Sequence, residues 1–138
     1  MFVTSPFFSR LYAETLGLLV EARNYSFLIN VDGLQGYPPR VQTKIVHESL
    51  RVTSRLTQVM AWLLYQKAIQ NGEISWIGAL SEDQALSKGE VFDDQSHHDS
   101  IDIPYGLRSL LSRSYSLYQR VSRLDAQLLN YQLRLIAC

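Results

Sequence analysis

The chain has 138 residues, one cysteine, and equal numbers of basic and acidic residues, 13 of each. This length predicts one domain that buries its own core without disulfides. The single thiol, Cys138, excludes an internal disulfide and favours a reducing compartment such as the cytosol.

The first helix is expected over about residues 5–30. Ser5-Pro6 is typical of a helix start, because serine caps helices and proline suits the first helical position. Apolar residues then recur every three or four positions, and we call such a row of residues a seam. The turn-forming residues of "NVDGLQGYPPR" end the helix. The seam consists of Phe8, Leu11, Thr15, Leu18, Ala22, Tyr25 and Ile29.

The second helix is expected over about residues 40–71, with Gly72 as its C-terminal cap. Its seam is Val41, Ile45, Val52, Leu56, Val59 and Leu63. A second row lies about 100° around the helix and comprises Val46, Thr53, Thr57, Met60 and Leu64. Together the two rows predict an apolar arc wide enough for two neighbouring helices.

The connector, residues 73–103, separates the second helix from the third and is strongly acidic. Between Glu73 and Asp102 eight acidic residues accompany one lysine, so this segment carries −7 and the rest of the chain +7. We expect helical turns over 74–80, a short helix over 81–89 and a mobile loop over 90–100.

The third helix, about 104–135, has a seam that repeats over four heptads. The seam is Leu107, Leu110, Ser114, Leu117, Val121, Leu124, Leu128, Tyr131 and Leu135. Nothing predicts a strand that has a partner. The sequence therefore predicts an all-α fold, a single-domain antiparallel three-helix bundle with long helices and an irregular acidic connector.

No catalytic set, phosphate-binding loop or metal site emerges from the motifs. His97, His98 and Asp99 have poor spacing for a metal, and His47 lies on a separate helix. The stretch from Arg51 to Ile69 raises a membrane span as one interpretation. Its longest uncharged run, residues 56–66, falls well short of the roughly 20 residues that a span needs. We expect no enzyme, no cofactor and no membrane segment.

Asp125 lies within the apolar arc of the third helix, where an unpaired carboxylate is costly. It is expected at the edge of the bundle, bonded to a neighbouring helix. We hypothesise that it fixes helix register through a polar partner on the second helix. The candidates for that partner are Thr53, Thr57 and Arg55.

Two basic stripes occur on the expected outer faces of the bundle: Arg40, Lys44, Arg51 and Arg55 on the second helix, and Arg113, Arg120, Arg123 and Arg134 on the third. Four interpretations stay open: a solvated face, a docking site for the acidic connector, a protein partner, and nucleic acid. The outer side of the second helix continues with large residues that need a cover or a partner: Gln58, Trp62, Tyr65 and Ile69.

Three stretches resemble the alphaproteobacterial family called regulator of CtrA degradation. They are "SPFFSRLYAETLGLLVEARNY", "PPRVQTKIVHESLRVTSRLTQVMAWLLYQKAIQNGEI" and "IPYGLRSLLSRSYSLYQRVSRLDAQL", about two-thirds of the chain. The resemblance implies a small cytoplasmic three-helix bundle that tends to dimerise and acts as an adaptor for the ClpXP protease. Its implied partners are ClpXP, a receiver-domain adaptor, a cyclic-di-GMP-binding protein and cargo such as CtrA.

The resemblance and the lack of a catalytic set predict a non-enzymatic protease adaptor. The chain ends soon after the third helix, where some members of the family carry a flexible tail. If such a tail contacts cargo, this protein is expected to use another surface or to have a narrower set of cargo. The candidate interaction residues form two surfaces: Arg51, Arg55, Gln58, Trp62 and Tyr65, and Arg113, Arg120 and Arg123. A nucleic-acid-binding regulator and a purely structural dimerisation module are the alternatives.

Overall fold

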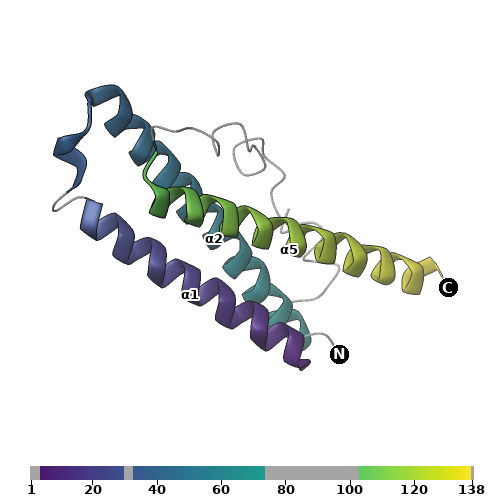
Figure 1. Ribbon diagram of the computed structural model, residues 1–138. Coiled ribbons are helices and arrows are strands. Elements are labelled where there is room, and N and C mark those ends of the chain that lie inside the picture. The colour runs from purple at the N-terminus through teal and green to yellow at the C-terminus, as the bar shows by residue number, and fades with distance from the viewer. Residues whose placement is uncertain (1–3, 30–32, 74–102, 138) are drawn as a thin grey trace.

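The protein is a bundle of three long helices, and the computed structural model describes residues 4–29, 33–73 and 103–137. The helices are α1 (Pro6–Leu28), α2 (Pro39–Gln70) and α5 (Tyr105–Ala137); a short 3-10 helix, η2 (Leu34–Gly36), lies between the first two. Figure 1 shows α1 beside α2, with α5 packed against both. No strand occurs in these residues, and the expected all-α three-helix fold is confirmed. The elements expected within residues 74–100 lie outside the described residues.

The helix ends follow the expected chemistry. The Ser5 hydroxyl accepts a hydrogen bond from the backbone N–H of Phe8 at 3.3 Å, which caps α1. Pro39 occupies the first turn of α2, where a missing N–H costs nothing. Gly72 follows the end of α2 with φ 77°, a left-handed conformation that favours glycine.

The expected seams of α1 and α2 line the core. Every seam residue of α2 is buried, and so are the seam residues of α1 as far as Ala22. On α5 the seam is buried as far as Val121, half-buried at Leu124 and Leu128, and exposed at Tyr131 and Leu135. The core of the bundle therefore ends well before α5 does.

The second row expected on α2 is wrong. Val46 and Leu64 are 44% and 51% exposed, and both threonines of that row are exposed. On its other side α2 buries Glu48, Arg51, Arg55 and Trp62. The third helix covers this polar side because its backbone and hydroxyl groups can accept hydrogen bonds there, as described below.

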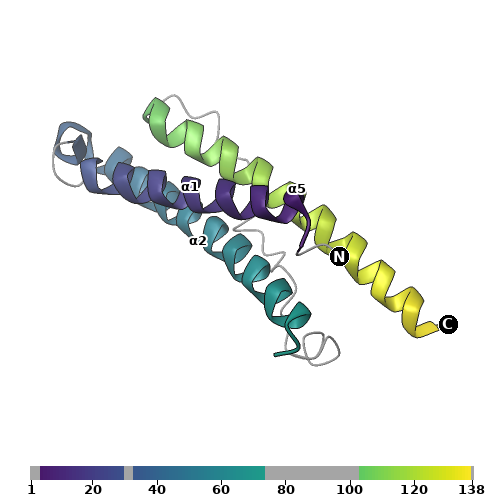
Figure 2. The same cartoon turned by 90° about the horizontal axis from the view of Figure 1, so that it is seen from below.

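Ion pairs mark the relative direction of α1 and α5. Arg113 pairs with Glu21, and Arg120 pairs with Glu14. A step of seven residues toward the C-terminus of α5 therefore corresponds to a step of seven residues toward the N-terminus of α1. The two helices are therefore antiparallel. In Figures 1 and 2 the C-terminal part of α5 extends past the N-terminus of α1 and away from the end of α2.

Candidate protein-interaction surfaces

Arg55 lies in the interior of the bundle, not on an outer basic stripe. Its side chain is fully buried, and Nη1 donates to the backbone oxygen of Leu111 at 3.0 Å and to Ser114 Oγ at 3.1 Å. Its guanidinium carbon lies 5.2 Å from the centre of the Tyr115 ring, a cation–π contact. Arg55 therefore joins α2 to α5, and its expected role as an exposed interaction residue is wrong.

Arg51 and Glu48 are buried beside Arg55, on the preceding turns of α2. Arg51 Nε lies 3.7 Å from Glu48 Oε2, and both side chains are almost completely buried. Burial, together with the neighbouring charge of Arg51, lowers the pKa of Arg55 to about 10, and the charge of Glu48 opposes this shift. The group remains charged at neutral pH. Two guanidinium groups and one carboxylate thus form a buried cluster, and the expectation that Arg51 is exposed is also wrong.

Trp62 provides the second polar contact between α2 and α5. Only 3% of Trp62 is exposed, and its Nε1–H donates to Asp125 Oδ1 at 2.9 Å. Asp125 therefore has a partner on the expected helix, but the partner is not one of the expected residues. Thr53 and Thr57 point to solvent, and Thr53 Oγ1 donates to the backbone oxygen of Ser49 at 3.1 Å.

The face expected around Trp62 is therefore mostly interior. Of its five residues, only Gln58 and Tyr65 keep part of their surface, and both are half-buried. The large tryptophan is an anchor between two helices of one chain, and the two arginines beside it belong to the buried cluster.

The basic stripe of α5 lies at the surface, and two of its four arginines form ion pairs within the chain. Arg113 and Arg120 are bound to Glu21 and Glu14 of α1. Arg123 is exposed and has no ion pair with the described residues. Arg123 and, further along, Arg134 are therefore the arginines of the stripe that have no ion pair with the described residues.

The Glu21–Arg113 pair predicts a small dependence of stability on pH. Hydrogen bonds from Arg113 hold the pKa of the Glu21 carboxyl below its ordinary value of 4.5, so its contribution is present above that value and disappears as acid protonates it. Glu21→Gln should cost less than about 1 kcal/mol at neutral pH, since both side chains are half-exposed. At a pH of about 3 or below the cost should shrink. Urea unfolding at both pH values measures this, with Glu73→Gln as the matched control; an equal cost at both would contradict it.

An uncharged stripe on α2 is exposed, and all of its members except Leu50 belong to the second row that the sequence predicted to face the core. Its members recur at intervals of three, four and seven residues, which places them on one face of the helix. They are Val46, Leu50, Thr53, Thr57 and Leu64. Leu50 is the most exposed of the three apolar residues, at 62%. Exposed apolar residues that cluster in this way mark interaction surfaces.

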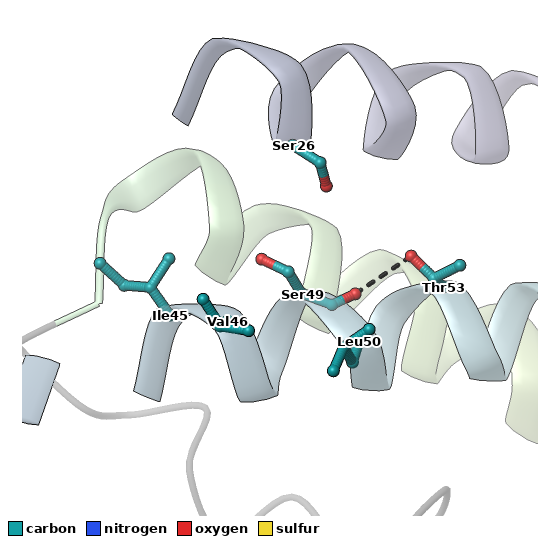
Figure 3. A pocket seen from close by; sticks show the side chains of 6 residues that line it. All are labelled: Ser26, Ile45, Val46, Ser49, Leu50 and Thr53. Carbon is teal, nitrogen blue, oxygen red and sulfur yellow. Dashed lines mark hydrogen bonds between the residues drawn. The ribbon is translucent and has the colours of Figure 1, made fainter. Parts of the chain in front are cut away.

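A cavity of about 190 Å³ lies between this stripe and α1 (Figure 3). In the figure Ser26 points from α1 toward the side chains of α2. Its lining combines three aliphatic side chains with three hydroxyls: Ile45, Val46, Leu50, Ser26, Ser49 and Thr53. The stripe thus borders a hollow that an apolar side chain of a partner can enter.

The described residues offer neither a metal-binding cluster nor a membrane-spanning helix. No group of three His, Cys, Asp or Glu side chains there could hold a metal ion. His97, His98 and Asp99 lie outside these residues. None of the described helices combines the length and the apolar character that a membrane span requires.

The model of a protein family described as "Protein of unknown function (DUF1465)" matches residues 1–134. The chain belongs to this family. Its structure is similar to the crystal structure of RcdA from Caulobacter crescentus CB15, with 31% sequence identity and a TM-score of 0.68. The match covers 89% of this chain and 91% of that chain. Comparison with curated proteins finds no match.

The match to RcdA confirms the resemblance seen in the sequence. The three stretches that carry the resemblance contain most of α1, all of α2 and the larger part of α5, in the same order. In this RcdA-like bundle the two sets of residues expected to form interaction surfaces have separate locations. The first set is largely internal, and the second lies along the exposed edge between α5 and α1.

Proposed function

We propose that this protein is a non-enzymatic adaptor that helps recruit cell-cycle regulatory proteins, CtrA among them, to the ClpXP protease. The similarity to RcdA over nine-tenths of the chain is the observation that carries this proposal. The compartment is the cytoplasm, where ClpXP acts. The further partners are a receiver-domain adaptor and a cyclic-di-GMP-binding protein, as the family resemblance implies.

An adaptor of this kind needs surfaces and no reactive site. Tethering raises the local concentration of cargo at the protease, so each contact can be weak. Two surfaces remain after Arg51, Arg55 and Trp62 are assigned to the interior. One is the uncharged stripe of α2, and the other is the exposed side of α5 that bears Arg123.

Reconstituted proteolysis tests the adaptor function. Purified ClpXP, the receiver-domain adaptor and the cyclic-di-GMP-binding protein are mixed with CtrA, and the loss of CtrA is followed with and without this protein. Adding the protein should accelerate degradation and should lower the concentration of CtrA that gives half the maximal rate. An identical rate in its presence and absence would refute the proposal.

We also propose that the protein forms a homodimer through the uncharged stripe of α2. A stripe without charges is complementary to itself, because no like charges oppose each other when two copies meet. Leu50→Asp should convert the dimer into a folded monomer, since Leu50 is exposed in the single chain. Sedimentation velocity measures the change. Leu133→Asp, the same substitution at an exposed leucine of α5, is the control and should stay dimeric.

The rival function, a nucleic-acid-binding regulator, loses support from the same geometry. Such a protein needs several exposed cations to contact phosphates. Arg51 and Arg55 are buried, and Arg113 and Arg120 are bound to glutamates of α1. The basic stripes therefore contribute to the fold more than to an electrostatic surface.

A further inference from the structure

Among the described residues, no other helix lies beside the last turns of α5. The pairs Glu21–Arg113 and Glu14–Arg120 fix an antiparallel register in which Pro6, the first residue of α1, lies near the level of Leu128. Figures 1 and 2 both show α5 continuing beyond this level, away from α1 and α2. We call residues 126–137 the α5 end.

The apolar seam that builds the core continues along the α5 end. Leu117 and Val121, which precede it, are fully buried in the bundle. At the same heptad positions further along, Tyr131 and Leu135 are 60% and 56% exposed. The apolar side chains of this seam therefore pack against other helices inside the bundle, whereas those in the α5 end face solvent. A seam of this spacing is suited to another helix.

The charges of the α5 end repeat a pattern that the bundle already uses. Arg113 and Arg120 are one heptad apart, and each binds a glutamate of antiparallel α1. The same heptad position recurs at Gln127 and at Arg134. Arg134 is exposed and has no ion pair with the described residues. Elsewhere in the structure, arginines on this edge of α5 thus form ion pairs with carboxylates of an antiparallel helix.

A second copy of the α5 end does not supply that carboxylate. Residues 126–137 contain no aspartate or glutamate. Asp125, just before them, already accepts a hydrogen bond from Trp62. Two α5 ends laid against each other would therefore leave both Arg134 side chains without an acidic partner.

We propose that the α5 end is a docking site for an amphipathic helix of a partner protein. This helix lies antiparallel to α5 and continues the line of α1. Its apolar seam packs on Leu128, Tyr131 and Leu135, and a glutamate or aspartate of the helix pairs with Arg134. The inference deepens the adaptor proposal, on which it rests for the partner being a protein.

A peptide of residues 6–28 is the probe, because α1 is the helix that this edge of α5 already accepts. Fluorescence anisotropy with the labelled peptide measures its binding to the full chain. Tyr131→Asp/Leu135→Asp should weaken binding about tenfold. Leu133→Asp, the matched control on the opposite side of the α5 end, should leave it unchanged.

A charge exchange tests the role of Arg134. Arg134→Glu should weaken binding of the peptide about threefold, the size of an exposed ion pair. A peptide with Glu14→Arg and Glu21→Arg should bind Arg134→Glu better than it binds the unchanged protein. Circular dichroism confirms that each variant remains folded, which is expected because all of the altered α5 residues are exposed.

Three outcomes overturn the docking site. The peptide fails to bind, or it binds every α5 variant equally, or Tyr131→Asp/Leu135→Asp abolishes self-association and so identifies a second copy as the occupant. Failure of the adaptor function is a separate result, since the binding assay contains no protease. Peptide binding without accelerated proteolysis refutes the adaptor proposal alone, and accelerated proteolysis without peptide binding refutes the docking site alone.

Discussion

Arg55→Ala should lower the free energy of unfolding by about 3–5 kcal/mol, the cost of removing one partner from a buried charged cluster. Arg55 is fully buried and donates to the Leu111 carbonyl and to the Ser114 hydroxyl of α5. Alanine removes both bonds, leaves an acceptor in the core without a donor, and opens a cavity. Urea unfolding of the variant and the unchanged protein, at one protein concentration, measures the loss.

Arg123→Ala is the matched control for Arg55→Ala. It removes the same side chain from an exposed position of α5 and should change stability by no more than about 0.5 kcal/mol. A loss below about 1 kcal/mol for Arg55→Ala would show that α5 relaxes around the site and that the hydrogen bonds contribute little.

Replacing all three charged residues of the buried cluster together should affect stability differently from Arg55→Ala. Glu48→Leu/Arg51→Met/Arg55→Met substitutes three buried charges with apolar side chains of similar size. Replacements of this kind are neutral or stabilise proteins by about 1–4 kcal/mol, because the cost of desolvating the charges disappears. Within the described residues, neither carboxylate oxygen of Glu48 has a hydrogen-bond partner, so that cost is poorly offset. A triple variant less stable than Arg55→Ala would contradict this account.

The seams and the helix ends could be predicted because both depend on local sequence. A period of three and four residues identified the buried row of α2, and a serine, prolines and Gly72 identified the helix ends. These signals need no knowledge of what lies across the bundle. They predicted the three long helices of the described residues and the side chains that meet at the centre.

The side of α2 that α5 covers could not be predicted from the same periodicity. A hydrophobic pattern assigns arginine to solvent, yet Arg55 is buried because its stem is apolar and its donors reach acceptors on a helix distant in sequence. Val46 and Leu64 satisfied the pattern and are exposed. The choice between the two sides depends on tertiary partners, which the sequence of one helix does not contain.

Trp62 and Asp125 both depart from the apolar pattern of their helices, and each is the other's hydrogen-bond partner. A carboxylate inside an apolar arc requires a donor, and a tryptophan outside its own seam carries one. The hypothesis of a polar partner on the second helix therefore identified the correct helix. Its named candidates were wrong, because threonine and arginine were considered as partners and the indole N–H was not.

Trp62→Ala should be as damaging as Arg55→Ala, with a loss of about 3–5 kcal/mol. Only 3% of the indole is exposed, so the substitution removes a large apolar contact and the donor to Asp125 together. Trp62→Phe separates these contributions, because phenylalanine retains most of the apolar surface and lacks the N–H. It should cost about 1–3 kcal/mol, since Asp125 loses its donor. Urea unfolding measures both variants.

A double-mutant cycle with Trp62→Phe and Asp125→Leu tests whether the bond itself accounts for the loss. Asp125→Leu alone leaves the buried indole N–H without an acceptor, which should cost about 1–3 kcal/mol. The double variant removes donor and acceptor together and should lose less than the two single losses combined. Strictly additive losses would show that the hydrogen bond is not the source of stability.

Asp125→Leu also decides whether this bond sets the position of α5. Trp62–Asp125 joins α2 and α5 just before the α5 end leaves the bundle, and the hydrogen bonds of Arg55 join the same two helices nearer their N-termini. If the bond fixes register, Asp125→Leu should speed hydrogen exchange of the backbone amides in residues 126–137 and leave the amides of residues 107–118 protected. If Asp125→Leu instead stabilises the protein and leaves its oligomeric state unchanged, the register hypothesis is wrong, because a leucine would then hold the helices as well as the polar pair does.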